Sequence, residues 1–109
     1  MTNNLLTPYF VDFWEKYRPW IAGNQPRSPE QWTPPLNFAR MMRNWISHHR
    51  GRVNFPNPND SGVTWEHISY YPSDKDKQAF GGDLVLGDLL LLIFEVAEAL
   101  SALSCPLDP

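Results

Sequence analysis

The chain has 109 residues and a mass of 12.6 kDa, the size of one domain spanning residues 1–109. Hydrophobic residues make up 42% of it, with five Trp, four Tyr and six Phe, so disordered, collagenous and coiled-coil classes are excluded. The single cysteine, Cys105, excludes an intramolecular disulfide and a zinc site built from several cysteines.

The net charge of -3 hides an uneven distribution of charge along the chain. Residues 31–59 carry four arginines and no acid, whereas residues 78–109 carry five acids and no lysine or arginine. We expect either that basic and acidic helices pack side by side, or that one block faces a partner of opposite charge.

The start of the chain lacks the basic and apolar regions of a secretory signal. The apolar run Leu89–Phe94 has six residues, far fewer than the roughly 20 that span a bilayer. The sequence therefore predicts a cytoplasmic protein without a membrane partner.

Thr7 and Pro8 predict the start of a first helix, because a Thr hydroxyl caps free N–H groups and a proline at the first helical position loses no hydrogen bond. Gly23-Asn24 predicts its end. Its apolar residues recur at three- and four-residue spacing and form one wide aromatic stripe, made of Phe10, Phe13, Trp14, Tyr17 and Ile21.

A proline-rich connector separates this helix from a second one. Residues 24–35 contain four prolines, which exclude a long helix, although Ser28 to Gln31 have the capping-box pattern of a single helical turn. Thr33-Pro34 repeats the helix-start signal, and Gly51 predicts the end of the second helix. One face of this helix is apolar (Phe38, Met41, Met42, Trp45, Ile46 and His49), and another is basic and polar (Arg40, Arg43, Ser47 and Arg50).

The segment after the second helix favours loops and extended backbone. Residues 52–62 are dense in Asn, Pro, Asp and Gly and are predicted to form a loop. Val63–Tyr71 is predicted to be a short strand or a hairpin arm, because its alternation breaks at His67-Ile68 and no partner strand is obvious. Residues 72–82 are again polar and are predicted to be mobile.

The last predicted helix covers residues 83–104, with Asp83 as its cap and Pro106 beyond its end. Its polar line, Asp88, Glu95 and Glu98, is narrow, and apolar side chains cover most of the remaining circumference. Burying one Leu, Ile or Phe is worth about 1.5 to 3 kcal/mol, a large share of a total stability of about 5 to 15 kcal/mol.

Two preceding helices can cover two sides of this last helix. We therefore expect its third side to pack on the same helix of a second copy, which gives a homo-oligomer through the 83–104 helix. The alternative is a monomer in which the aromatic helices enclose it. The predicted fold class is mainly α: a small three-helix domain with a short β element and proline-rich connectors.

Glu95 and Glu98 lie three residues apart, so both carboxylates project from one helical face and could share a divalent cation. The run from Asp88 to Leu100 reads DLLLLIFEVAEAL. It resembles the first metal-binding helix of the all-α MazG-like nucleoside triphosphate pyrophosphohydrolases, which carries E-x-x-E in an apolar helix. The resemblance implies Mg²⁺-dependent hydrolysis of nucleoside triphosphates to monophosphates, with a further helix that supplies a second acidic pair. No E-x-x-D follows before Pro109, so the resemblance implies a fragment or a remnant of such an enzyme.

The segment Arg40 to Arg52 places four guanidinium groups near one helix. Arginine donates paired hydrogen bonds to phosphate, and Trp45 could stack on a base if it were exposed. This segment is an alternative site for an anion or a nucleic acid, although the chain as a whole is acidic.

The first hypothesis is a non-enzymatic protein-binding or regulatory protein, similar in action to an assembly factor or an inhibitor. It would act through helix-face and aromatic contacts and need no cofactor. The chain has more aromatic rings than a small core needs, and arginines can supply charge at the rim of an interface. The candidate contacts for a protein partner are therefore Phe13, Trp14, Tyr17, Trp20, Arg40, Arg43 and Arg50.

Overall fold

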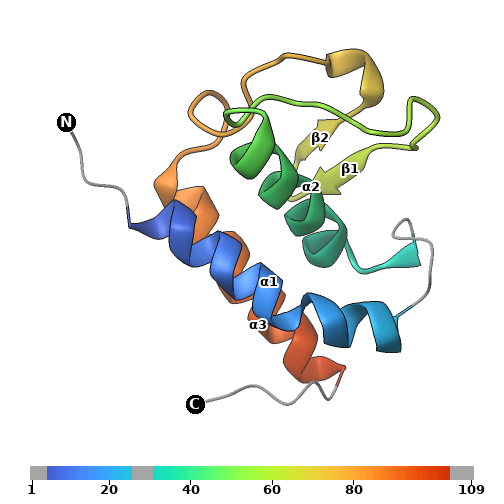
Figure 1. Cartoon of the computed structure of the whole chain (residues 1–109), viewed down its shortest axis with the longest axis vertical. Helices are drawn as coiled ribbons and strands as arrows, with labels where there is room; N and C mark the ends of the chain where they lie inside the picture. Colours follow the sequence, from blue (N-terminus) through green and yellow to red (C-terminus); the bar gives the residue numbers. More distant parts are fainter. Residues whose placement is uncertain (1–4, 26–30, 104–109) are drawn as a thin grey trace.

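The computed structural model describes residues 5–25 and 31–103. Within these ranges the chain forms three α-helices and one antiparallel hairpin (Figure 1). The elements are α1 (Leu6–Asn24), α2 (Pro34–His48), β1 (Val63–Trp65), β2 (Ile68–Tyr70), the short 3-10 helix η2 (Pro72–Asp74) and α3 (Leu86–Ala102). The mainly α class with a small β element is confirmed.

The second helix, α2, lies at the centre of the molecule. It contacts α1, α3 and β1 (Figure 1). Its apolar face is fully buried at Phe38, Met41 and Trp45. The helices α1 and α3 contact each other and run in the same direction, so their starts lie at the same end of the pair. None of the described helices is long and apolar enough to cross a bilayer.

Two helices begin at residues other than those expected. The N-cap of α1 is Leu5, and Thr7 and Pro8 lie in the first turn. Backbone N–H groups of the first turn have no partner within the helix, so a proline there costs no hydrogen bond. The start of α3 is Leu86, because the carboxylate of Asp88 accepts a hydrogen bond from the backbone N–H of Val85 at 2.9 Å and so caps this end. The prediction that Asp83 caps the helix was wrong.

Asp83 is instead used by the hairpin. Its carboxylate accepts a hydrogen bond from the Tyr70 hydroxyl at 2.9 Å and lies 3.5 Å from the ammonium group of Lys77. The predicted helical turn from Ser28 and the predicted helix end at Ser104 fall on residues outside the described ranges.

The hairpin explains why no partner strand was obvious in the sequence. Val63 pairs with Tyr70 and Trp65 with Ile68, so both strands come from the single run that was predicted as one arm. The alternation breaks because the turn falls inside the run, at Glu66, whose φ of 57° is typical of the first residue of a tight hairpin turn.

Candidate functional site

The helix α3 has a buried face and an exposed apolar face. Five of its residues are buried against α1, α2 and the hairpin: Leu89, Leu92, Ile93, Val96 and Leu100. On the opposite side Leu86, Leu90, Leu91 and Phe94 are 37%, 44%, 45% and 61% exposed. The described chain therefore leaves one side of α3 uncovered.

The start of α1 adds further apolar side chains at the same end of the helix pair. Leu5 and Tyr9 are exposed, and the ring of Tyr9 stacks on Phe13 at a centroid distance of 6.4 Å. We call the following set the α1–α3 surface: Leu5, Tyr9, Val85, Leu86, Leu90, Leu91 and Phe94. Only Tyr71, beside the hairpin, is a comparably exposed large hydrophobic residue elsewhere in the described chain. Such a concentration of apolar side chains is typical of a docking surface.

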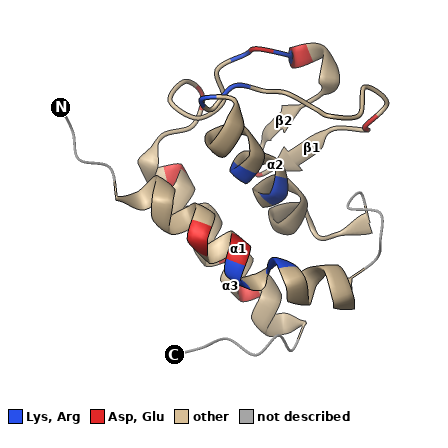
Figure 2. Cartoon of the chain, in the orientation of Figure 1, with Lys and Arg blue, Asp and Glu red and all other residues tan. Residues whose placement is uncertain are grey.

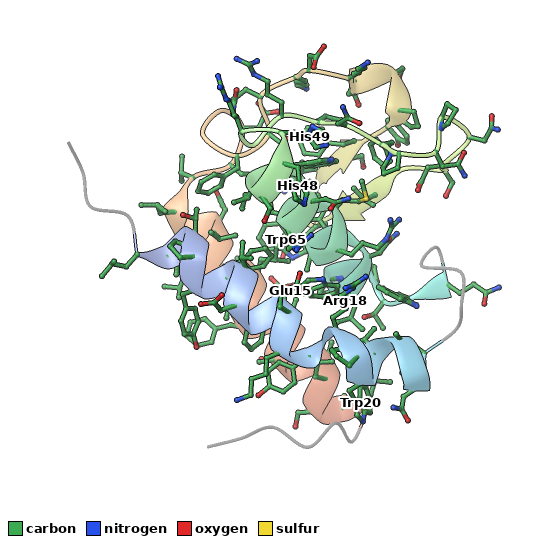
Figure 3. All side chains as sticks on the ribbon, viewed as in Figure 1. Glu15, Arg18, Trp20, His48, His49 and Trp65 are labelled. Carbon is green, nitrogen blue, oxygen red and sulfur yellow. The ribbon has the colours of Figure 1, made fainter. Side chains whose placement is uncertain are left out.

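The predicted aromatic contacts lie beside this surface or in the core. Trp14 and Tyr17 are buried, and Phe13 and Trp20 are partly buried against the core. Trp20 lies towards the far end of α1 (Figure 3). Among these four rings, Phe13 is the one that contacts a member of the α1–α3 surface, through Tyr9.

Two of the predicted arginine contacts are engaged inside the molecule. Arg40 donates a hydrogen bond to Asn37 Oδ1 at 2.8 Å and pairs with Asp60 at 3.3 Å, and Arg43 pairs with Glu15 of α1. Arg50, just past the end of α2, is exposed. Figure 2 shows basic positions on α2 and acidic positions on the neighbouring α1. The basic helix is therefore neutralised by α1 and the 52–62 loop rather than by the acidic α3.

The tryptophan of the basic segment is unavailable to a nucleic acid in this structure. Trp45 is fully buried, and its indole N–H donates a hydrogen bond to the carbonyl of Asn54 at 2.9 Å. Base stacking needs an exposed ring. The geometry therefore gives no support to base recognition by this helix.

The candidate metal ligands Glu95 and Glu98 lie in different surroundings. Glu95 Oε1 accepts a hydrogen bond from Trp65 Nε1 at 3.1 Å, whereas Glu98 is exposed. Burial, together with a hydrogen bond to Glu66 at the hairpin turn, raises the pKa of Glu95 above its ordinary value. The described ranges contain no group of three or more His, Cys, Asp or Glu that could hold a metal ion.

Glu66 was missed by sequence reasoning. It lies far from Glu95 in the chain, and only the packing of the hairpin turn on α3 brings the two carboxyl groups together. No spacing rule for a single helix could have identified this contact.

The free energy of unfolding is expected to fall less between about pH 4.5 and pH 7 when Glu95 is replaced with glutamine. A raised pKa means that the folded chain binds this proton more tightly than the unfolded chain. The resulting stabilisation is complete below the unfolded pKa and is lost as the pH rises through the folded value. Glutamine keeps an acceptor for Trp65 and carries no charge, so urea unfolding should show a smaller difference between the two pH values.

Glu98→Gln is the matched control, because it removes one carboxylate from the exposed side of the same helix. Its pH dependence of unfolding should change less than that of Glu95→Gln, because the charge of Glu98 is the smallest of the causes that raise the pKa of Glu95. Equal pH slopes for Glu95→Gln and the unmodified chain would contradict a raised pKa of Glu95 in the folded chain.

The comparisons with known proteins add no relative. No family model matches the chain, and neither the curated proteins nor the solved structures contain a significant match.

Proposed function

We propose that this protein is a non-enzymatic association protein that docks through the α1–α3 surface, and that the first occupant of this surface is a second copy of the chain. The observation that carries the proposal is the concentration of exposed large hydrophobic side chains at the starts of α1 and α3. Covering such side chains removes apolar area from water, which is the main favourable term in protein association.

The spacing on α3 suits a second copy. Leu86, Leu90 and Phe94 follow one another at four-residue intervals and form a ridge, which can pack into the groove beside the same ridge of another helix. A two-fold axis presents the same patch from both copies. With the axis near Leu90, the two α3 helices are antiparallel and Phe94 lies against Leu86 of the other copy.

The charges at the edge of the surface agree with this arrangement. The exposed side of α3 has acids but no base, so a parallel pairing would bring Glu98 of both copies together. The antiparallel pairing instead places Glu98 beside the start of the other α3, where the helix dipole is positive. Self-association in this orientation therefore keeps the two Glu98 side chains apart.

Sedimentation velocity from about 1 to about 200 µM tests the proposal, with dimer expected to accumulate as concentration rises. The double variant Leu90→Glu/Phe94→Glu should remain monomeric, because dimerisation would bury an unpaired charge at each position. Tyr71→Glu is the matched control, since it changes an equally exposed ring outside the surface and should leave the dimer intact. A wild-type chain that sediments as a 12.6 kDa monomer at every concentration would refute self-association.

A further inference from the structure

A polar groove of about 430 Å³ lies beside β2, and none of its lining residues belongs to the α1–α3 surface. Four consecutive residues of the hairpin, His67 to Tyr70, line it from one side, and Lys77 and Asp83 line it from the connection that leads to α3. Its volume is within the range of about 300 to 1,000 Å³ that is typical of binding sites.

One wall of this groove is an unpaired strand edge. The sheet has two strands, and no other strand of the described chain lies beside β2. Trp65 pairs with Ile68 across the two-residue turn, so the hydrogen bonds to β1 belong to Ile68 and Tyr70. Ser69 lies between them, opposite Thr64, and its side-chain oxygen is 2.9 Å from Thr64 Oγ1. By the alternation of an antiparallel pair, the backbone N–H and C=O of Ser69 point away from β1 and into the groove.

Two carboxylates and one ammonium group lie near the Tyr70 hydroxyl, on the opposite side of the groove. Asp83 accepts the hydrogen bond from Tyr70, and Asp74 also lies close enough to act on the Tyr70 phenol. Lys77 pairs with Asp83, and its ammonium group lies 5.6 Å from the centre of the Tyr70 ring, so one carboxylate is in excess here. The residue opposite Tyr70 in an added strand would point its side chain to this same face of the sheet. The charge there favours a basic side chain.

The geometry points to a second binding site, in which an extended basic peptide segment adds to β2 as a third, antiparallel strand. Ser69 would donate its N–H to the carbonyl of the residue opposite and accept that residue's N–H at its own C=O. Basic side chains on either side of that residue would then lie on the Tyr70 face, next to Asp83. This mode of binding is independent of self-association through α3.

The probe is the peptide acetyl-Thr-Arg-Thr-Arg-Thr-Arg-Thr-amide, titrated into the ¹⁵N-labelled full chain. In a register with threonine opposite Ser69, its alternation places arginine on the Tyr70 face. We expect saturable shifts of the Ile68 to Tyr70 amide signals and slower hydrogen exchange of the Ser69 amide. The same peptide with glutamate in place of arginine should bind more weakly. Absence of saturable shifts with the arginine peptide would overturn the proposal.

A matched pair of variants separates backbone pairing from simple charge attraction. Ser69→Pro removes the outward N–H without taking a hydrogen bond from β1, and proline is tolerated on an edge strand with its N–H side outward. Ser69→Ala removes only the hydroxyl. We expect Ser69→Pro to lose roughly tenfold in affinity and Ser69→Ala to bind like the unmodified chain. Unchanged affinity in a folded Ser69→Pro variant would overturn strand addition.

If Ser69→Pro does not fold, the test moves to the peptide. N-methylation of its central threonine removes the donor that Ser69 C=O would accept, and the protein stays unmodified. The methylated peptide should bind at least roughly tenfold more weakly than the parent. Equal binding of the two peptides would show that the groove attracts charge without pairing a strand.

Discussion

Replacing Trp45 with alanine is expected to lower the free energy of unfolding by about 3 to 5 kcal/mol. The side chain is fully buried in α2 and packs edge-on against Phe55 and Tyr70, at centroid distances of 5.7 and 5.5 Å. Its indole N–H also donates a hydrogen bond to the carbonyl of Asn54. Alanine would therefore leave a cavity and also free a carbonyl that the indole now binds.

Urea unfolding of two further variants separates these contributions. Trp45→Phe keeps most of the apolar contact but removes the donor to Asn54, so its loss should be smaller than that of Trp45→Ala. Trp20→Ala removes a tryptophan that is only partly buried, and we expect a smaller loss than at Trp45. A Trp45→Ala variant within about 1 kcal/mol of the unmodified chain would contradict the central position of this ring.

Leu92 and Leu91, adjacent on α3, are expected to respond to alanine in different ways. Leu92 is 1% exposed, so Leu92→Ala should cost about 2 to 5 kcal/mol at any protein concentration. Leu91 is 45% exposed, so Leu91→Ala should cost much less in the monomer. If a second copy covers Leu91, the cost of its removal must increase with protein concentration, because association stabilises only the folded chain.

Thermal unfolding at about 2 and about 200 µM distinguishes these cases. The difference in Tm between Leu91→Ala and the unmodified chain should widen at the higher concentration, whereas the difference for Leu92→Ala should stay constant. A Leu91→Ala difference that is the same at both concentrations would indicate that this side of α3 remains in contact with solvent.

Hydrophobic periodicity predicted the three helices because each has one face that contacts the core. The stripe from Phe10 to Ile21 and the α2 face from Phe38 to Trp45 are buried in this way. Helix starts were less predictable, since they depend on which of several nearby polar groups forms the cap. Asp83 and Asp88 are both suitable caps by residue type, and the hydrogen bond from Tyr70 to Asp83 is a tertiary contact that the local sequence does not encode.

The candidate surface was predicted in part. The apolar circumference of the last helix indicated that one of its sides would be uncovered, and Leu90, Leu91 and Phe94 are the residues found there. The exposed apolar residues at the start of α1 were missed, because the prediction for this helix centred on its aromatic stripe, in which Trp14 and Tyr17 are buried. Tyr9 lies on a second line through Phe13 and Trp20 at four- and seven-residue spacing, which is the signal that could have identified it.

An isotope-filtered nuclear Overhauser experiment on an equal mixture of labelled and unlabelled chain tests most directly whether the α1–α3 surface is covered by a second copy. At about 500 µM the account predicts cross-peaks from the Phe94 ring of one copy to the methyl groups of Leu86 and Leu90 of the other. A spectrum without cross-peaks between copies at that concentration would contradict it, and so would cross-peaks that arise only from residues outside this surface.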